Sequence, residues 1–245
     1  MLIHGWTASA DINFFTAYES LGERFRVIAF DQRGHGSGLR SRRGVRLEDC
    51  ADDVARVATA MGVDRFIPVG YSMGGAIAQL TWRRHRERVS GLVLAATAPH
   101  FAERRDERLS FLGLTGLAAL ARVTPGQARD RISEQVFLQR KTQTWGSWAV
   151  AQAARHDWRM VLEAGRALGG FSSLDWLSEI DVPTAVITTM SDPVVPLRRQ
   201  VRLFEEIPHS AAFRVEGEHD AIVARAERFV PTLVRAIDHV VENAV

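Results

Sequence analysis

One serine stands in a glycine-rich hexapeptide, GYSMGG at residues 70–75. An apolar, strand-like run precedes the hexapeptide, and a helix-like segment follows it. Where a strand turns sharply into a helix, the turning residue is exposed, and side chains two positions away on either side would collide. Gly70 and Gly74 occupy those two positions, and glycine tolerates a close backbone approach. The spacing predicts that Ser72 is a nucleophile. The alternative is a glycine-rich helix start that only packs against a strand.

A serine hydroxyl becomes nucleophilic when a nearby base takes its proton. Of the eight histidines, His219 lies in the segment EGEHD, directly after the last expected strand and before the last expected helix. That loop lies at the carboxyl edge of a parallel sheet, as Ser72 does, so we expect His219 to be the base. His35, among glycines after an early strand, is the main alternative, and His100 could line the cleft. Three further histidines fall in helix-like segments as surface or packing residues: His85, His156 and His239.

A carboxylate must orient the base. Asp192 follows the apolar run 184–189 in the segment SDPVVP, where two prolines stiffen the loop. The expected triad therefore has the chain order Ser72, Asp192, His219. Asp181 precedes its strand and lies at the wrong end of the sheet, and Asp220 is too close in sequence to His219 to orient that ring well. The alternative for Asp192 is a turn aspartate that caps the next helix.

The tetrahedral intermediate of acyl transfer needs two hydrogen-bond donors for its oxyanion. One is expected to be the backbone N–H of Met73, which begins the helix behind Ser72, where the positive end of the helix dipole points at the site. The segment His4-Gly5-Trp6 follows the first visible strand, and the backbone N–H of Trp6 is expected to supply the other. His4 is expected to order this loop rather than to carry a proton.

Short apolar runs alternate with amphipathic segments, which predicts a parallel sheet with helices on both faces. The expected strands are residues 2–3, 27–30, 66–69, 91–95, 184–188 and 211–215, and the expected helices are 47–61, 75–85 and 221–242. No convincing strand falls between about Pro99 and Leu177. We predict a helical insertion there, with a helix start at Thr124-Pro125 and a helix end at Gly169-Gly170. The domains are then an α/β core, residues 1–98 and 178–245, and a helical cap, residues 99–177.

The motifs resemble those of the α/β-hydrolase superfamily, in its serine esterase and cofactor-free haloperoxidase branch. The matching pieces are collinear: HGW at 4–6, DQRGHGSG at 31–38, GYSMGG at 70–75, SDPVVP at 191–196 and GEHD at 217–220. Thr7 stands where a proline is common in that branch, and Tyr71 replaces a frequent histidine. The resemblance implies an Asp31–Arg33 pair that organises its own loop, and a cap that sets substrate choice. Substrate-lining candidates are Tyr71, Trp145 and Trp148, with Trp158, Phe137 and Phe111 behind them.

The resemblance also implies two strands ahead of the HGW segment, whereas only Met1-Leu2-Ile3 precede it here. We expect either a shortened start or a smaller sheet with an inner strand, Val27–Phe30, at its edge. An exposed apolar edge promotes association, so we expect lower stability or a homo-oligomer that covers the edge.

Composition limits the other classes. The net charge is only +2, with 46% hydrophobic and 24% charged residues, which is typical of a soluble globular chain. Arginine runs lie near acidic residues without interleaved aromatics, so we expect no nucleic-acid partner. No segment suits a signal peptide or membrane insertion. The lone Cys50 favours a reducing compartment, so a cytoplasmic location is expected.

We expect a serine hydrolase that cleaves a carboxylic ester or lactone of a small to medium, apolar molecule through an acyl-enzyme on Ser72. No metal or organic cofactor is expected. Two alternatives remain: the same triad used for carbon–carbon bond hydrolysis or acyl transfer, and a ligand receptor of this fold that turns nothing over.

Overall fold

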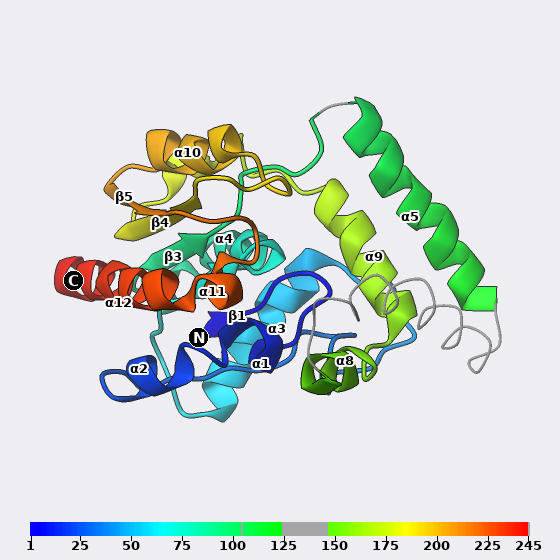
Figure 1. Cartoon of the computed structure of the whole chain (residues 1–245), viewed down its shortest axis with the longest axis horizontal. Coiled ribbons are helices and arrows are strands. Elements are labelled where there is room, and N and C mark those ends of the chain that lie inside the picture. Colours follow the sequence, from blue (N-terminus) through cyan, green and yellow to red (C-terminus); the bar gives the residue numbers. More distant parts are fainter. Residues whose placement is uncertain (104, 124–146, 245) are drawn as a thin grey trace.

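A five-stranded parallel sheet organises the protein (Figure 1). The computed structural model describes residues 1–103, 105–123 and 147–244. The strands lie in sequence order across the sheet, and each neighbouring pair is parallel. They are β1 (Leu2–Ile3), β2 (Val69–Tyr71), β3 (Leu92–Ala95), β4 (Thr184–Thr189) and β5 (Ser210–Val215). The predicted fold class, a parallel sheet with helices on both faces, is confirmed.

Alternate residues of the central strands face two separate apolar cores. In β3, Leu92 and Leu94 belong to one core cluster, whereas Val93 and Ala95 belong to the other. Because both faces are covered, the strands read in the sequence as unbroken apolar runs. The first core is covered by α3 (Leu47–Ala60), α4 (Met73–Arg84) and α10 (Leu197–Glu206). The second is covered by α1 (Ala10–Phe14), α2 (Tyr18–Gly22), α11 (Ala221–Ala224) and α12 (Ala226–Asn243).

The amphipathic pattern located α3 and α4 to within about two residues at each end. Helix α3 buries Cys50, Ala51, Val54 and Ala58 and carries acidic residues in its first turn, where the helix dipole favours them. The segment predicted over residues 221–242 divides at Arg225 into α11 and α12. The described residues also form two 3₁₀ turns, η1 (Arg86–Arg88) and η3 (Leu177–Glu179).

One predicted strand does not form, and another is shorter at its start than predicted. Val27–Phe30 is not a strand: Ala29 makes one bridge to Leu2, and the Leu2 amide donates to the Ile28 carbonyl at 2.8 Å. Strand β1 has only two residues, so it offers too few backbone hydrogen bonds for residues 27–30 to form a strand beside it. Likewise β2 begins at Val69 rather than Phe66, because Pro68 has no N–H to donate. Val27–Phe30 is half-exposed and lies against a groove of about 520 Å³ beside β1.

The described part of the insertion holds three helices and no strand: α5 (Arg105–Val123), α8 (Ser147–Ala153) and α9 (Trp158–Gly169). Gly170 caps α9, as the Gly169-Gly170 pair predicted. The predicted start at Thr124-Pro125 lies outside the described residues. Helices α5 and α9 pack side by side (Figure 1), and α9 buries Met160 and Ala164 in the first core. Helix α9 is therefore packed into the core.

Buried polar contacts also tie α9 to the core. Arg159 and Glu163, both buried, pair at 2.9 Å. The Glu163 carboxylate also accepts the Val45 amide at 3.0 Å, and Arg159 donates to the Ser41 carbonyl. A buried charge is costly unless it is paired and hydrogen-bonded, so these contacts fix α9 over the segment from Asp31 to Arg46.

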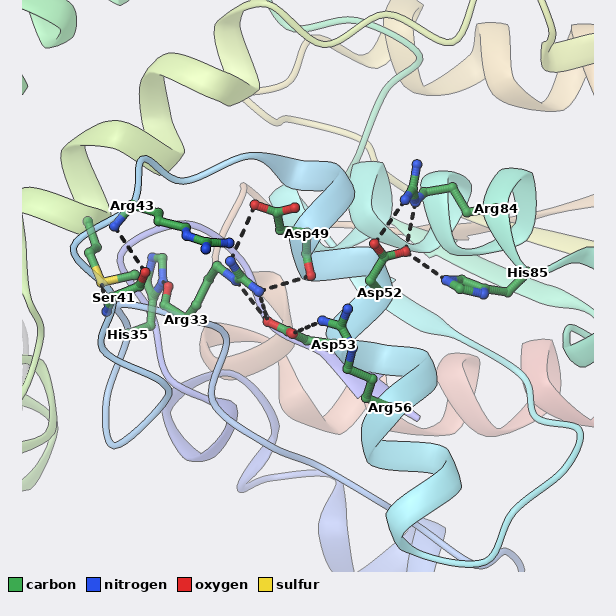
Figure 2. A network of polar contacts seen from close by, with 11 residues as sticks. Arg33, His35, Ser41, Arg43, Asp49, Asp52, Asp53, Arg56, Arg84 and His85 are labelled. Atoms are coloured by element: carbon green, nitrogen blue, oxygen red, sulfur yellow. Dashed lines mark hydrogen bonds and ion pairs between the residues drawn. The ribbon is translucent and has the colours of Figure 1, made fainter.

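The expected Asp31–Arg33 pair does not form. Arg33 reaches α3 instead, with its Nε 2.8 Å from the Asp53 carboxylate and a second contact to Asp49 at 3.4 Å (Figure 2). Asp31 accepts two backbone amides, those of Ala10 and Ser37, at 2.8 and 2.7 Å. The arginine therefore joins its loop to a helix, and the aspartate holds the loop through backbone amides instead.

Within the described residues, no helix is both long enough and apolar enough to span a bilayer.

Candidate active site

Ser72 lies at the sharp turn between β2 and α4. Its φ of 55° and ψ of −119° are strained for a residue with a side chain. Three hydrogen bonds hold the turn: the Ser72 amide donates to the Ala95 carbonyl at 2.9 Å, and the Ser72 carbonyl accepts the Gly75 amide and the Thr97 hydroxyl. Strain held this firmly at a turn that lines a cavity is typical of an activated nucleophile.

The glycines around Ser72 are required by close backbone contacts. A Cβ on Gly70 would lie 2.2 Å from the Gly74 carbonyl oxygen, and one on Gly74 would lie 1.9 Å from the Ile3 carbonyl oxygen. Real Cβ atoms do not approach so closely, so α4 could not start directly behind β2 with any larger residue at either position. The steric reading of GYSMGG is confirmed.

The side chains of Ser72, His219 and Asp192 come together from three distant parts of the chain. Ser72 Oγ lies 2.9 Å from His219 Nε2, and His219 Nδ1 lies 2.8 Å from Asp192 Oδ2. Because a carboxylate can only accept, the proton of the neutral ring belongs on Nδ1. The lone pair of Nε2 then faces the serine hydroxyl, which is the arrangement that a base needs.

Asp192 is a buried carboxylate that accepts several hydrogen bonds from the protein. Its Oδ1 accepts the amides of Val194 and Val195 at 2.8 Å, and its Oδ2 accepts the Thr189 hydroxyl at 2.7 Å besides the histidine. Burial raises the pKa of Asp192, but the hydrogen bonds and the nearby His219 outweigh burial and lower the pKa overall. Asp192 is therefore ionised at neutral pH.

Two backbone amides near Ser72 are candidates for binding an oxyanion. Met73 is the first residue of α4, so its N–H has no acceptor within the helix. The neighbouring Gly5 amide is not available, because it donates to Asn13 Oδ1 at 2.7 Å. Trp6 lines the same cavity as Ser72, so its amide and that of Met73 are the candidate donors for an oxyanion.

His4 has both ring nitrogens engaged. Nδ1 donates to the Gly5 carbonyl at 2.8 Å, and Nε2 accepts the Gln32 amide at 2.8 Å. Burial lowers the pKa of His4, and the Gly5 hydrogen bond and Asp31 oppose that shift. The ring is a neutral link between the two loops, as expected from the sequence.

The rival histidines do not reach Ser72. His35 is fully buried with its ring 5.1 Å from that of His4, and burial lowers the pKa of His35 well below its ordinary value. His156 is also buried and accepts the Gly36 amide at 2.7 Å. His85 bonds Asp52 at 2.9 Å (Figure 2), and His100 lies near Glu103.

A cavity of about 660 Å³ opens beside Ser72 and His219. Trp148 and Phe15 meet edge to face at 5.5 Å and, like Tyr71, line it. Of the other lining candidates, Trp145 and Phe137 lie outside the described residues. Trp158 packs on His156 and Phe111 packs on Gly169, and neither lines this cavity.

Sequence reasoning missed several residues that support the site. Gln200 is fully buried and bonds both Thr189 and the Val195 carbonyl. Asn13 is a polar residue in the apolar run INFF, which was the one available signal. Its side chain secures Gly5 beside the nucleophile. Among the residues with described positions, no cluster of three or more metal-ligating side chains occurs.

A sequence model of the alpha/beta hydrolase fold matches residues 1–222. The chain belongs to the α/β-hydrolase family. This α/β-hydrolase is 29% identical over 229 residues to RutD of Rhizobium rhizogenes, a proposed carbamate hydrolase, covering 89% of this chain and 84% of the relative. It is 27% identical over 250 residues to a poly(3-hydroxyalkanoate) depolymerase of Ectopseudomonas oleovorans, covering all of this chain and 86% of the relative.

Solved structures have the same fold. A thermophilic esterase from Thermogutta terrifontis superposes with a TM-score of 0.80 at 22% identity, covering 98% of this chain and 89% of the other. The superposition shows the fold, and the family model and the curated relatives show that the chain is an α/β-fold hydrolase.

Proposed function

We propose that the protein is a serine hydrolase that cleaves a carboxylic ester or lactone through an acyl-enzyme on Ser72. One observation carries the proposal: Ser72 Oγ, His219 and Asp192 form a continuous hydrogen-bonded chain with links of 2.9 and 2.8 Å. Those distances are within the range that proton transfer requires. The esterase and depolymerase names among the relatives support ester chemistry.

The proposed reaction has two halves. Ser72 Oγ attacks the acyl carbon while His219 Nε2 takes the hydroxyl proton, and the Trp6 and Met73 amides bind the oxyanion. The intermediate collapses when His219 returns that proton to the leaving alkoxide. A water then attacks the acyl carbon, His219 takes its proton, and the acid leaves as Ser72 is reprotonated. Asp192 stays ionised and stabilises the charged ring.

The cavity favours an uncharged, apolar acyl or alcohol group. Most of its lining is apolar, with Trp6, Ile12, Phe15 and Trp148 as the large side chains. Among the lining residues that the structure describes, Asp220 is the one acidic side chain, and neither lysine nor arginine is present. Anionic substrates would therefore be disfavoured.

Hydrolysis of p-nitrophenyl esters of increasing acyl length tests the proposal. Wild type should hydrolyse the short and medium esters, and Ser72→Ala should lower kcat by at least about 10⁴-fold. Ser90→Ala is the matched control, because Ser90 precedes β3 at the opposite end of the sheet. Absence of hydrolysis across esters and lactones would favour carbon–carbon cleavage, acyl transfer or a receptor instead. A p-nitrophenyl carbamate in the same panel would report the carbamate chemistry named for RutD.

A further inference from the structure

Tyr71 links the strand that carries the nucleophile to the loop that carries the base. It is the last residue of β2 and directly precedes Ser72. Its hydroxyl donates a hydrogen bond to the backbone carbonyl oxygen of His219, 2.5 Å away. The two partners are separated by 148 residues in sequence. This contact therefore joins the residue before the nucleophile directly to the main chain of the base.

The surroundings of Tyr71 hold its hydroxyl in place. The side chain is only 3% exposed, its ring meets Phe229 at 5.6 Å, and the His219 ring lies 5.9 Å away. Burial raises the pKa of Tyr71, and the charge of Asp192 raises it further. The phenol therefore stays protonated at neutral pH, and it remains a donor to the carbonyl.

The loop that receives this hydrogen bond is otherwise exposed. Glu216, Glu218 and Asp220 are all exposed, and Gly217 has a φ of 151°. Two backbone contacts brace the loop on either side of the base: the Ser191 amide bonds the Gly217 carbonyl, and the Ala221 amide bonds the Glu218 carbonyl. The Tyr71 contact acts on the main chain of His219 itself.

We infer that Tyr71 is a positioning residue for the base: its hydroxyl fixes the main chain of His219 so that Nε2 stays within reach of Ser72 Oγ. This inference rests on the proposed function. Displacement of a catalytic group by about 1 Å can cost about 100-fold in rate. Removing the hydroxyl should therefore slow the chemical step without removing an apolar contact to the substrate, because the aromatic ring that lines the cavity remains.

Tyr71→Phe tests the inference, and the chain supplies its own control. The protein has two tyrosines, and the other, Tyr18, donates its hydroxyl to Asp11 at 3.0 Å and does not line the cavity. For Tyr71→Phe we expect kcat for a p-nitrophenyl ester to fall about 10- to 100-fold with KM changed less than about threefold. For Tyr18→Phe both should stay within about twofold of wild type.

Hydrogen–deuterium exchange separates positioning from misfolding. Tyr71→Phe should speed amide exchange in residues 216–221 and leave the core strands protected, whereas a folding defect would speed exchange throughout. A slow variant with global loss of protection, or a folded variant with wild-type kcat, overturns the inference. Ser72→Ala distinguishes a failure of the positioning role from a failure of the proposed function. If Ser72→Ala is inactive while Tyr71→Phe is fully active, only the positioning role fails. If Ser72→Ala keeps wild-type turnover, the proposed function fails.

Discussion

The indole nitrogen of Trp6 donates a hydrogen bond to the backbone carbonyl of Val161, 2.7 Å away. Trp6 belongs to the loop whose amide is the proposed oxyanion donor, and Val161 belongs to helix α9 of the insertion. The Trp6 loop is therefore anchored to α9, so we expect the position of α9 to influence the position of the proposed donor.

Gly165 in α9 lies directly against the Trp6 indole. A Cβ at Gly165 would stand 2.5 Å from Trp6 Cζ2, so Gly165→Ala must displace the indole or the helix. We expect kcat/KM to fall at least about tenfold and the free energy of unfolding to drop by about 1–3 kcal/mol, as overpacking does. Gly116→Ala in α5 is the control. A Cβ there meets nothing within 4 Å, so activity should hold and stability should rise by up to about 1 kcal/mol. Equal kinetics for the two variants would contradict the coupling.

Asn13 keeps the Gly5 amide away from the substrate. Asn13→Asp retains an acceptor for that amide but places a negative charge close to Ser72. A Cβ on Gly5 would lie 3.4 Å from Asn13 Oδ1 and 3.2 Å from Ser72 Cβ, so the two side chains are near neighbours. A negative charge there opposes the oxyanion, so kcat should fall about 100-fold. The other asparagine, Asn243, ends α12 and does not line the cavity. Asn243→Asp should therefore leave kcat unchanged. Steady-state kinetics would refute the electrostatic reading if both variants matched wild type.

Asp192 is the proposed orienting carboxylate. In Asp192→Asn the amide can still accept the Val194 and Val195 amides through its oxygen, but its NH₂ would then face His219 Nδ1 and favour the wrong tautomer. We expect kcat to fall about 10⁴-fold. Asp220→Asn, next to the base in sequence, should cost less than about tenfold. The assignment would be wrong if the Asp220 variant were the slower of the two.

Acid should weaken the fold through two buried histidines. Burial lowers the pKa of both His4 and His35, so they stay neutral in the fold while the unfolded chain takes up protons below about pH 6.5. The free energy of unfolding therefore falls as pH drops below 6.5, by up to about 1.4 kcal/mol per pH unit for each ring. Urea unfolding of His35→Gln between pH 7.5 and 5 should show a shallower slope than wild type. An unchanged slope would remove His35 from the explanation.

Local steric and periodic signals predicted much of the fold. The glycine spacing of GYSMGG reflects contacts within a few residues and with the adjacent strand, so the turn at Ser72 followed from residue size together with the strand before it and the helix after it. The order Ser72, Asp192, His219 followed because parallel strands bring their carboxyl ends to one edge. These inferences needed only the alternation of apolar runs and amphipathic segments.

The features that the sequence did not predict depend on contacts between residues that are far apart in the chain. Arg33 pairs with α3 rather than with Asp31 beside it, because the helix offers two carboxylates in reach. The Tyr71 hydroxyl finds its acceptor 148 residues away, and the Trp6 indole finds one 155 residues away. Residue types and their spacing do not indicate which distant residues become hydrogen-bond partners. The Val27–Phe30 run failed as a strand for the same reason: a strand needs a paired neighbour as well as apolar residues.

The most direct test of the catalytic claim is the site of covalent modification by a fluorophosphonate. After brief treatment at neutral pH, peptide mass spectrometry should place one phosphonyl adduct on Ser72, and labelling should be abolished in Ser72→Ala and at least about 100-fold slower in His219→Ala. Labelling of folded Ser72→Ala at the wild-type rate, or an adduct on a different residue in the wild type, would contradict it.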